Sequence, residues 1–329
     1  MEDQLNLLLQ FAIEKQATDI HFVLSNSHLQ VAFRTSHGLE KLVQDVWQPP
    51  LLEYLKFISG MDLSNPYSPQ SGQFTWCINH REIPFRFSII VNHGMQTGVL
   101  RFLYGQHHIQ FGSLSYLDHQ NVIFKNITNS RQGLIISSGP TGSGKTTTMH
   151  AILHEIALKG KYKVVTLEDP IEIEDPLYIQ LQLNPQAGFT YDVGIEELLR
   201  HDPDVIFIGE TRNAYTAKML VRAGLTGHLV FTTIHAKNGI ETITRLLDLG
   251  VSKFDLEHTL SLIIAQRLYQ TDKEEKQCIY EMVSKQEIEH ILQYQQYSKN
   301  HETLSFEIQK AIENGVISDQ QAWNDLQDL

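Results

Sequence analysis

Nine consecutive residues carry the clearest chemistry in this sequence. Gly139, Gly144, Lys145 and Thr146 satisfy the spacing G-x-x-x-x-G-K-[ST] of a phosphate-binding loop. Glycines permit positive φ, so the loop can turn successive N–H groups inward and make an anion site at a helix start. The lysine neutralises β- and γ-phosphates, and the threonine hydroxyl ligates Mg²⁺. The predicted nucleotide-binding residues are Gly139, Pro140, Thr141, Gly142, Ser143, Gly144, Lys145, Thr146 and Thr147.

The residues around this loop have the pattern that a phosphate-binding loop requires. The apolar run 134–137 reads as a strand, and residues 145–158 read as a helix. A glycine turn beside a chance Lys-Thr pair is the alternative, but it leaves the flanking strand and helix unexplained. We therefore predict that the chain binds ATP together with Mg²⁺.

Acidic side chains directly follow two further predicted strands. They are Glu168, Asp169 and Glu172 after residues 163–167, and Glu210 after residues 204–208. In a parallel sheet, ligands bind outside the carboxyl ends of the strands. A carboxylate there can hold Mg²⁺, and another can orient or deprotonate the attacking water. An acidic surface loop is the alternative, and it poorly explains acidic groups at two strand ends.

Two histidines flank the predicted strand 229–234. His228 precedes it and His235 follows it, and a strand rises about 3.3 Å per residue, so they cannot touch the same phosphate. Only His235 lies at the carboxyl end, where it could bond a γ-phosphate and report its loss. His228 is expected to be structural or to lie at a subunit boundary. The chain has 16 histidines, so a surface or core position is the default for any one of them.

Two arginines are predicted to face each other across a hairpin. Strands 83–91 and 97–103 would meet in a tight turn at His93-Gly94. In that register Arg86 lies directly opposite Arg101, and like charges so placed are destabilising. The pair therefore suggests a shared anion. A solvated face carrying two arginines, or a slipped register, is the alternative.

Residues 1–105 are predicted to form a smaller α+β domain with a mostly antiparallel sheet. Leucines in residues 2–16 have the spacing of an amphipathic helix, and a second helix begins at Pro49-Pro50 and ends before Gly60. The predicted strands are 19–24, 29–34, 73–78, 83–91 and 97–103.

A second pattern follows the predicted linker, residues 106–112. Over residues 113–268, short apolar runs alternate with helical segments, which is typical of a parallel sheet with right-handed crossovers. The predicted strands are 134–137, 163–167, 204–208 and 229–234, and the predicted helices are 145–158, 195–199, 214–223 and 239–247. Residues 269–329 are polar and rich in glutamine, and we expect them to be a helical region.

Composition and charge narrow the class of protein. The 329 residues are 42% apolar with a formal net charge of −12, which is typical of two or three soluble domains. Residues 270–329 hold twelve Asp and Glu against five Lys and Arg, so direct nucleic-acid binding is not expected. The cysteines, Cys77 and Cys278, indicate neither a disulfide framework nor a zinc site. Neither a signal peptide nor a membrane-spanning run is recognisable, so a cytoplasmic location is expected.

Taken together, these motifs resemble those of the secretion-type ATPases of type II secretion and type IV pili. The resemblance is strongest to the short competence-pilus ATPases of Gram-positive bacteria. The matching segments are ATDIH (17–21), GPTGSGKTT (139–147), TLEDPIE (166–172), DPDVIFIGETR (202–212), TGHLVFTTIHA (226–236) and AQRL (265–268).

The resemblance implies a RecA-like ATPase domain behind a smaller PAS-like domain, assembled as a homo-hexamer with nucleotide between the two domains. It implies that Glu172 is the catalytic glutamate, that Glu210 is the Walker B carboxylate and a Mg²⁺ ligand with Thr146, and that His235 is a sensor. Arg86 and Arg101 match the arginines that the smaller domain presents to the phosphates. The implied partner is an inner-membrane platform protein, met at the cytoplasmic face of the membrane.

Several features depart from the family pattern. The large leading domain of many assembly ATPases is not expected here. Only Cys278 lies where a tetracysteine zinc knot would branch off, so no zinc is expected. Asn213 stands where the family usually has Asp, which weakens any role for that position. The C-terminal segment of the retraction motors is not recognisable in VSKQEIEHIL (283–292) or nearer the end.

Three functions are therefore compared. The first is a motor that assembles a competence-type pilus or pseudopilus for DNA uptake. The second is a retraction motor of the same family, which the missing C-terminal segment disfavours. The third is a DNA-translocating RecA-like ATPase or a nucleotide-gated binding module, which the acidic balance disfavours.

Overall fold

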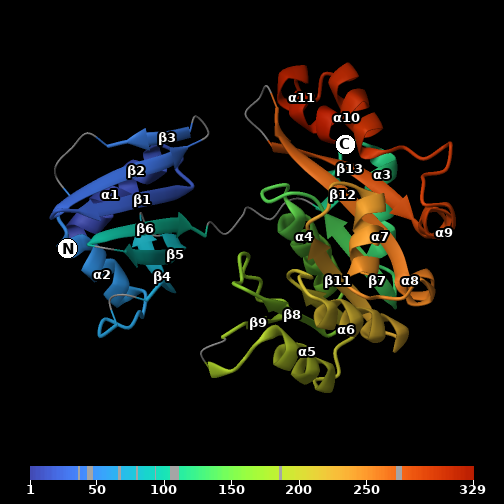
Figure 1. The fold of residues 1–329 in the computed structure, drawn as a ribbon, viewed down its shortest axis with the longest axis horizontal. Coiled ribbons are helices and arrows are strands. Elements are labelled where there is room, and N and C mark those ends of the chain that lie inside the picture. Colours follow the sequence, from blue (N-terminus) through green and yellow to red (C-terminus); the bar gives the residue numbers. More distant parts are fainter. Residues whose placement is uncertain are drawn as a thin grey trace. The chain divides into compact units, whose positions relative to one another are not determined.

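The computed structural model of this protein describes residues 1–35, 38–42, 47–65, 68–78, 81–92, 94–103, 111–184, 187–271 and 276–329. The chain divides into two compact units, Met1–Gln106 and His107–Leu329 (Figure 1). Each unit is organised around one sheet, and the two sheets differ in strand direction.

The first unit is a six-stranded antiparallel sheet in the order β3-β2-β1-β6-β5-β4. Its elements are α1 (Glu2–Glu14), β1 (Asp19–Ser25), β2 (His28–Thr35), β3 (Gly38–Lys41), α2 (Pro50–Ile58), β4 (Gln70–Ile78), β5 (Arg81–Asn92) and β6 (Met95–Phe102). Helix α1 buries Leu5, Leu8, Leu9 and Ala12, the apolar stripe that predicted it. The prediction of an α+β domain with an antiparallel sheet is confirmed, although β3 was not predicted.

Strands β5 and β6 pair in the predicted register. Arg86 lies opposite Arg101, and the pairing continues to Asn92 and Met95 at the end of the hairpin. His93, at the centre of the predicted turn, lies outside the described residues. So do residues 104–110, which include most of the predicted linker 106–112.

The second unit has a seven-stranded sheet in the order β13-β12-β7-β11-β10-β8-β9. Its first elements are η1 (Phe111–Ser113), α3 (Asp118–Ile127), β7 (Gly133–Ser138), α4 (Lys145–Leu158), β8 (Val164–Glu168), β9 (Ile179–Gln182), α5 (Tyr191–Arg200), β10 (Val205–Ile208) and α6 (Ala214–Leu225). They continue with β11 (Leu229–Ile234), α7 (Gly239–Asp248), α8 (Lys253–Thr259), β12 (Leu260–Gln270), β13 (Lys276–Ser284), α9 (Lys285–Tyr294), α10 (Leu304–Glu313) and α11 (Asp319–Asp328).

Helices cover both faces of this sheet (Figure 1). Side chains of α3 and α4 pack on one face, which includes Ile135 and Phe231. Helices α5 to α9 pack on the other face, which includes Ile136 and Val230. Adjacent residues of one strand thus enter different cores, as the alternation of side chains along a strand requires.

The prediction of a helical region over residues 269–329 is wrong at its start. Residues 276–284 form β13, which pairs antiparallel with β12, so the predicted boundary between 268 and 269 cuts through a strand. Helices do follow from residue 285. Most of β12 and the middle of β13 are buried on both faces, so these strands lack a period-two pattern. Their polar side chains, such as Gln266, Arg267 and Glu281, are bonded inside the protein and made the segment look solvated in the sequence. Strand β9 was also not predicted.

No helix among the described residues is long and apolar enough to span a bilayer.

Candidate active site

The loop between β7 and α4 has the backbone that the glycine spacing predicted. Gly139, Gly142 and Gly144 have positive φ values of 153°, 80° and 86°. A Cβ atom on Gly139 would lie 2.5 Å from the Ser143 Oγ atom and 2.6 Å from the Gln266 carbonyl oxygen. Only glycine therefore fits at that position without movement of its neighbours.

Lys145 begins α4 and is buried, with 8% of its surface exposed. Its Nζ atom donates hydrogen bonds to the carbonyl oxygens of Gly139, at 2.9 Å, and Pro140, at 2.8 Å. Burial lowers the pKa of Lys145 to about 8, Glu210 and Glu172 oppose this shift, and Arg267 adds to it. An ammonium group bonded to neutral carbonyls in a buried site is suited to a phosphate.

Two observations test whether the loop fits a nucleotide with Mg²⁺. The buried Ser143 Oγ atom has no hydrogen-bond partner. The loop leads directly into α4, so Thr146 lies in the first turn of that helix, at the positive end of its dipole. Hydroxyl and carboxylate oxygens are the ligands that Mg²⁺ prefers, so Thr146 and Glu210 fit this ion.

Glu210 and His235 come from neighbouring parallel strands and meet at the carboxyl edge of the sheet. Glu210 follows β10, His235 follows β11, and their Oε1 and Nε2 atoms are 3.3 Å apart. Arg212 lies 2.7 Å from the other oxygen of Glu210. Burial, followed by the nearby charge of Lys145, lowers the pKa of His235, and Glu210 opposes this shift. His235 is therefore a neutral imidazole near pH 7.

The acidic residues after β8 differ from one another. Glu172 and Asp169 are exposed, and the charge of Glu172 acts on Lys145. Glu168, in contrast, is 2% exposed and accepts hydrogen bonds from Thr166 and Gln180. His150 lies 3.0 Å from its other oxygen. Glu168 was one of the predicted candidates for Mg²⁺ or water, and both of its oxygens have side-chain partners inside the protein.

His228 lies at the opposite edge of the sheet, as predicted. Its Nδ1 atom is 3.1 Å from the Ala223 carbonyl oxygen and 3.1 Å from the Thr226 hydroxyl, at the end of α6. These contacts support a structural role, which is one of the two alternatives that we expected.

Asn213, the departure from the family pattern, caps α6. Its Oδ1 atom accepts a hydrogen bond of 2.8 Å from the backbone N–H of Thr216. Asparagine and aspartate cap helices equally well, so the substitution leaves this helix start intact.

Arg86 and Arg101 each have a partner in the first unit. The Nε atom of Arg101 lies 2.7 Å from Asp19 Oδ1, and the Nε atom of Arg86 donates to Ser71 Oγ at 3.0 Å. Asp19 offsets part of the repulsion between the two guanidinium groups. Both side chains keep further N–H donors that could bind an anion.

Sequence reasoning assigned no role to Gln266, although the AQRL segment was recognised. Gln266 is fully buried in β12, where its Nε2 atom donates to the Ser143 carbonyl oxygen at 2.7 Å and its Oε1 atom accepts from Ser137 Oγ at 2.9 Å. It therefore joins β7 to the phosphate-binding loop. A glutamine inside a buried apolar run was the available signal.

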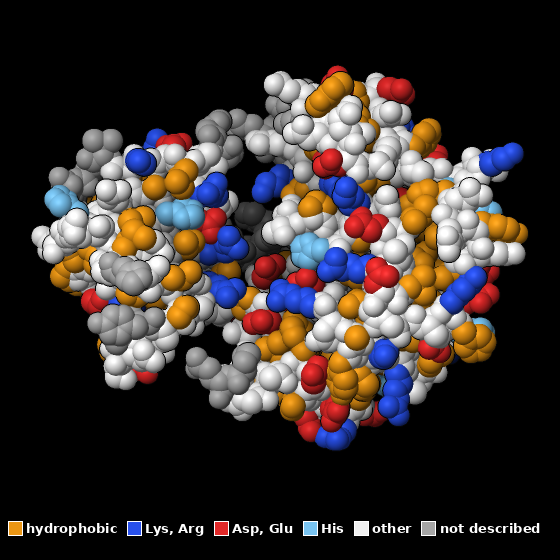
Figure 2. Space-filling model, in the orientation of Figure 1, with side chains coloured by type: hydrophobic (Ala, Val, Ile, Leu, Met, Phe, Trp, Pro, Cys, Tyr) orange, Lys and Arg blue, Asp and Glu red, His pale blue; other side chains and the backbone are white. Residues whose placement is uncertain are grey.

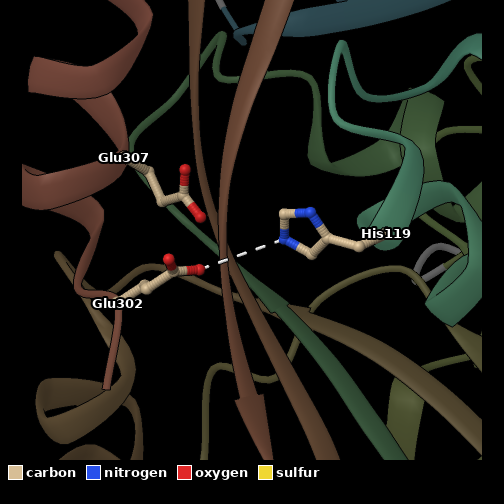
Figure 3. Close-up of side chains that lie close together, drawn as sticks. All are labelled: His119, Glu302 and Glu307. Atoms are coloured by element: carbon tan, nitrogen blue, oxygen red, sulfur yellow. Dashed lines mark ion pairs between the residues drawn. The ribbon is translucent and has the colours of Figure 1, made fainter. Parts of the chain in front are cut away.

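Within the described part of the chain, one group of His and Glu side chains lies close enough to consider a metal ion: His119, Glu302 and Glu307 (Figure 3). Their ligand atoms lie within 4.8 Å of one another. Glu302 already pairs with Lys310 at 3.5 Å, and Gln120 donates to Glu307 at 3.1 Å. The group therefore joins α3 to α10, and we assign no metal to it.

Comparison with known proteins identifies the family. A family model described as "Type II/IV secretion system protein" matches residues 1–322. The competence protein ComGA of Bacillus subtilis is 35% identical over 264 residues, which are 79% of this chain and 74% of that protein. ComGA of Halalkalibacterium halodurans is 37% identical over 80% of this chain and 76% of its own length. The HofB homolog of Haemophilus influenzae is 35% identical over 80% of this chain, but the match spans only 58% of that protein.

Solved structures agree with this result. The pilus retraction motor PilT with bound ADP has a TM-score of 0.77 and 26% identity, over 97% of this chain and 96% of that chain. The ATPase DotB of Legionella pneumophila has the same TM-score at 20% identity, over 98% and 94% of the two chains. The fold of the second unit is therefore RecA-like. The chain belongs to the type II/IV secretion system protein family and is an ATPase of that family.

Proposed function

We propose that this ATPase is the hexameric motor that assembles a competence-type pilus or pseudopilus for DNA uptake. The observation that carries the assignment is its match to two competence proteins over 74% and 76% of their lengths, against 58% for the HofB homolog. The net charge of −12 supports a motor that does not itself bind DNA. On the face seen in Figure 2, Lys and Arg side chains of the second unit lie among Asp and Glu side chains.

The site supports the following roles in ATP hydrolysis. The residues 139–147 hold the phosphates, and Lys145 exchanges its carbonyl partners for the β- and γ-phosphates. Thr146 and Glu210 would hold Mg²⁺, which neutralises the developing phosphate charge when it is bound. Glu172, exposed and near Lys145, takes the proton of the attacking water. The neutral His235 senses the γ-phosphate from the end of β11.

Arg86 and Arg101 complete the site in this proposal by stabilising charge on the phosphates. Arg86 and Arg101 lie directly opposite each other across the hairpin, which supports this role. Two like charges so placed lower the stability of the sheet, and a bound anion would offset their repulsion. They act within a subunit or between subunits of a closed homo-hexameric ring, in which heterologous contacts couple the sites.

The proposed partner is an inner-membrane platform protein, approached from the cytoplasm. The acidic region 269–329 is its proposed docking surface, and twelve acidic residues between 270 and 329 support that choice. ATP-driven movement of the motor would then push or rotate the platform protein and load pilin subunits.

The test is to delete the gene in its host and to count surface pili and transformants. Loss of both, restored by the wild type and by Lys161→Ala but not by Lys145→Ala, is the expected result. The PilT match favours a second candidate, a retraction motor. Extra or longer pili in the deletion strain would identify that function. Normal pili, with tight duplex binding by the purified protein, would instead favour a DNA translocase.

A further inference from the structure

Residues 169–178 form a loop that leaves β8 and returns as β9, and Glu172 lies in its first half. The loop is fastened from the β9 side by two glutamines. Gln182 accepts from the backbone N–H of Ile171 at 3.3 Å, and Gln180 donates to the Ile173 carbonyl oxygen at 2.8 Å. The two residues adjacent to Glu172 are therefore both bonded, while Glu172 itself stays exposed.

Helix α4 fastens the same loop from the other side. Thr146, His150 and His154 are spaced four residues apart and so share one face of the helix. Thr146 lies in the phosphate-binding loop motif, His150 meets Glu168 and Tyr178, and His154 meets Asp175. One rigid helix thus links the phosphate-binding loop to both ends of the segment that carries Glu172.

Both ring nitrogens of His150 have partners. Its Nε2 atom is 3.0 Å from the Glu168 carboxylate and its Nδ1 atom is 2.6 Å from the Tyr178 hydroxyl. Burial raises the pKa of Tyr178, so this phenol stays protonated. A carboxylate accepts hydrogen bonds, so the Nε2–H group of His150 is the donor to Glu168. Every polar atom of this buried histidine is used.

His154 makes a shorter contact to the middle of the loop. Its Nδ1 atom is 2.5 Å from Asp175 Oδ2, and Asp175 Oδ1 accepts from the backbone N–H of Leu177 at 3.0 Å. The backbone N–H of Asp175 in turn donates to Gln180 at 2.7 Å. Asp175 is 6% exposed, so the removal of His154 would leave a buried carboxylate without one of its donors.

We propose that His150 and His154 are positioning residues, which fix the loop carrying Glu172 to the helix that begins at the phosphate-binding loop. The inference rests on the role proposed above for Glu172. Neither histidine touches the reacting atoms. Their effect is to hold the glutamate at a constant place relative to the phosphates, and small misplacements of a reacting group lower the rate without a matching loss of binding.

The test compares variants of the full-length protein by ATP turnover and by the binding of a fluorescent ADP analogue. His154→Leu should lower kcat by about 10- to 100-fold and change the ADP-analogue Kd by less than about twofold. His154→Asn keeps an N–H donor close to the position of Nδ1 and should restore most of kcat. Tyr178→Phe removes only a hydroxyl and tests the His150 contact in a protein whose packing is preserved.

Two further measurements separate positioning from folding. Amide hydrogen exchange of residues 169–178 should be faster in His154→Leu, while exchange in β7 stays as in the wild type. His119→Leu is the matched control, because it removes a histidine–carboxylate contact, 4.0 Å to Glu302, that joins other elements. It should leave kcat unchanged.

The outcomes distinguish this inference from the proposal on which it rests. In a Glu172→Gln background, His154→Leu should cause no further loss, because the group that it positions is gone. If His154→Leu has the kcat of the wild type while Glu172→Gln is inactive, the positioning role is overturned and the role of Glu172 stands. Wild-type turnover in Glu172→Gln overturns the role of Glu172 and the positioning role with it.

Discussion

At the carboxyl edge of the second sheet, Lys145 is buried beside Glu210 and His235 in a small cluster of mixed charge. At the amino edge, a pocket of about 430 Å³ is lined by residues that include Arg131, Lys161 and His228. Both edges thus present cations and a histidine. At the carboxyl edge, three glycines of the phosphate-binding loop have positive φ and Lys145 is buried, whereas at the amino edge Lys161 is exposed in a pocket that also includes Asp204. A cavity with suitable residue types is therefore a weaker sign of a reaction site than a preorganised backbone.

The strongest test of this comparison replaces one lysine at each edge. Lys145→Ala should abolish measurable ATP turnover, because the buried site then lacks its cation for the β- and γ-phosphates. Lys161→Ala should leave turnover unchanged. Phosphate release by the purified proteins measures both, and equal losses would contradict the assignment of chemistry to the carboxyl edge.

The next largest effect concerns the first unit. Arg86→Ala and Arg101→Ala should each lower turnover by on the order of 10³-fold in assembled protein, if they stabilise transferred phosphate charge as arginine fingers do. Arg34→Ala, at an exposed position of the same sheet, is the control. Unchanged turnover in either variant would show that this arginine does not stabilise the phosphates and favour the alternative of a solvated face.

Glu172→Gln should lower turnover by roughly 10²-fold or more, since it removes a general base, while ATP binding is retained. The control is Glu174→Gln, which changes an exposed carboxylate two residues away in the same loop. Should Glu172→Gln turn over ATP like the wild type, the base would have to be Glu210.

The pKa of Lys145 predicts opposite pH trends for binding and for folding. ATP binding needs the charged lysine, so affinity should fall roughly tenfold for each pH unit above about 8. Folding lowers the pKa of Lys145 from 10.5 to about 8, so between these pH values the unfolded chain binds more protons than the folded chain. The contribution of Lys145 to the free energy of unfolding therefore rises with pH over that window. Binding titrations and urea unfolding from pH 7 to 10 measure the two trends. Lys145→Met should remove both, and parallel trends in the wild type would contradict the assignment.

The smallest effects come from the two histidines that flank β11. His235→Ala should lower turnover with little change in stability, because its side chain meets Glu210. His228→Ala should leave turnover unchanged and cost about 0.5–1.5 kcal/mol of stability by removing a hydrogen bond at the end of α6. The measurements are ATP turnover and the free energy of unfolding of both variants. A loss of turnover in His228→Ala together with a loss of stability in His235→Ala would contradict the comparison of the two edges.

Much of the fold was predictable because its signals are local. The glycine spacing predicted the positive φ values at Gly139, Gly142 and Gly144. Hairpin geometry predicted that Arg86 faces Arg101. Strand β13 was not predictable in the same way, since its pairing with β12 depends on hydrogen bonds between segments whose polar side chains resemble those of a solvated helix.

By itself, the sequence determined which residues can do chemistry and which edge of the sheet they occupy, because both follow from residue type and from the order of strands and helices. Only the tertiary structure decided which carboxylates are buried among partners and which are exposed. Glu168 and Glu172 are four residues apart in one acidic segment, yet His150, Thr166 and Gln180 occupy the first and leave the second exposed. Those partners come from α4, β8 and β9, and no local pattern records which of their side chains will meet a given carboxylate.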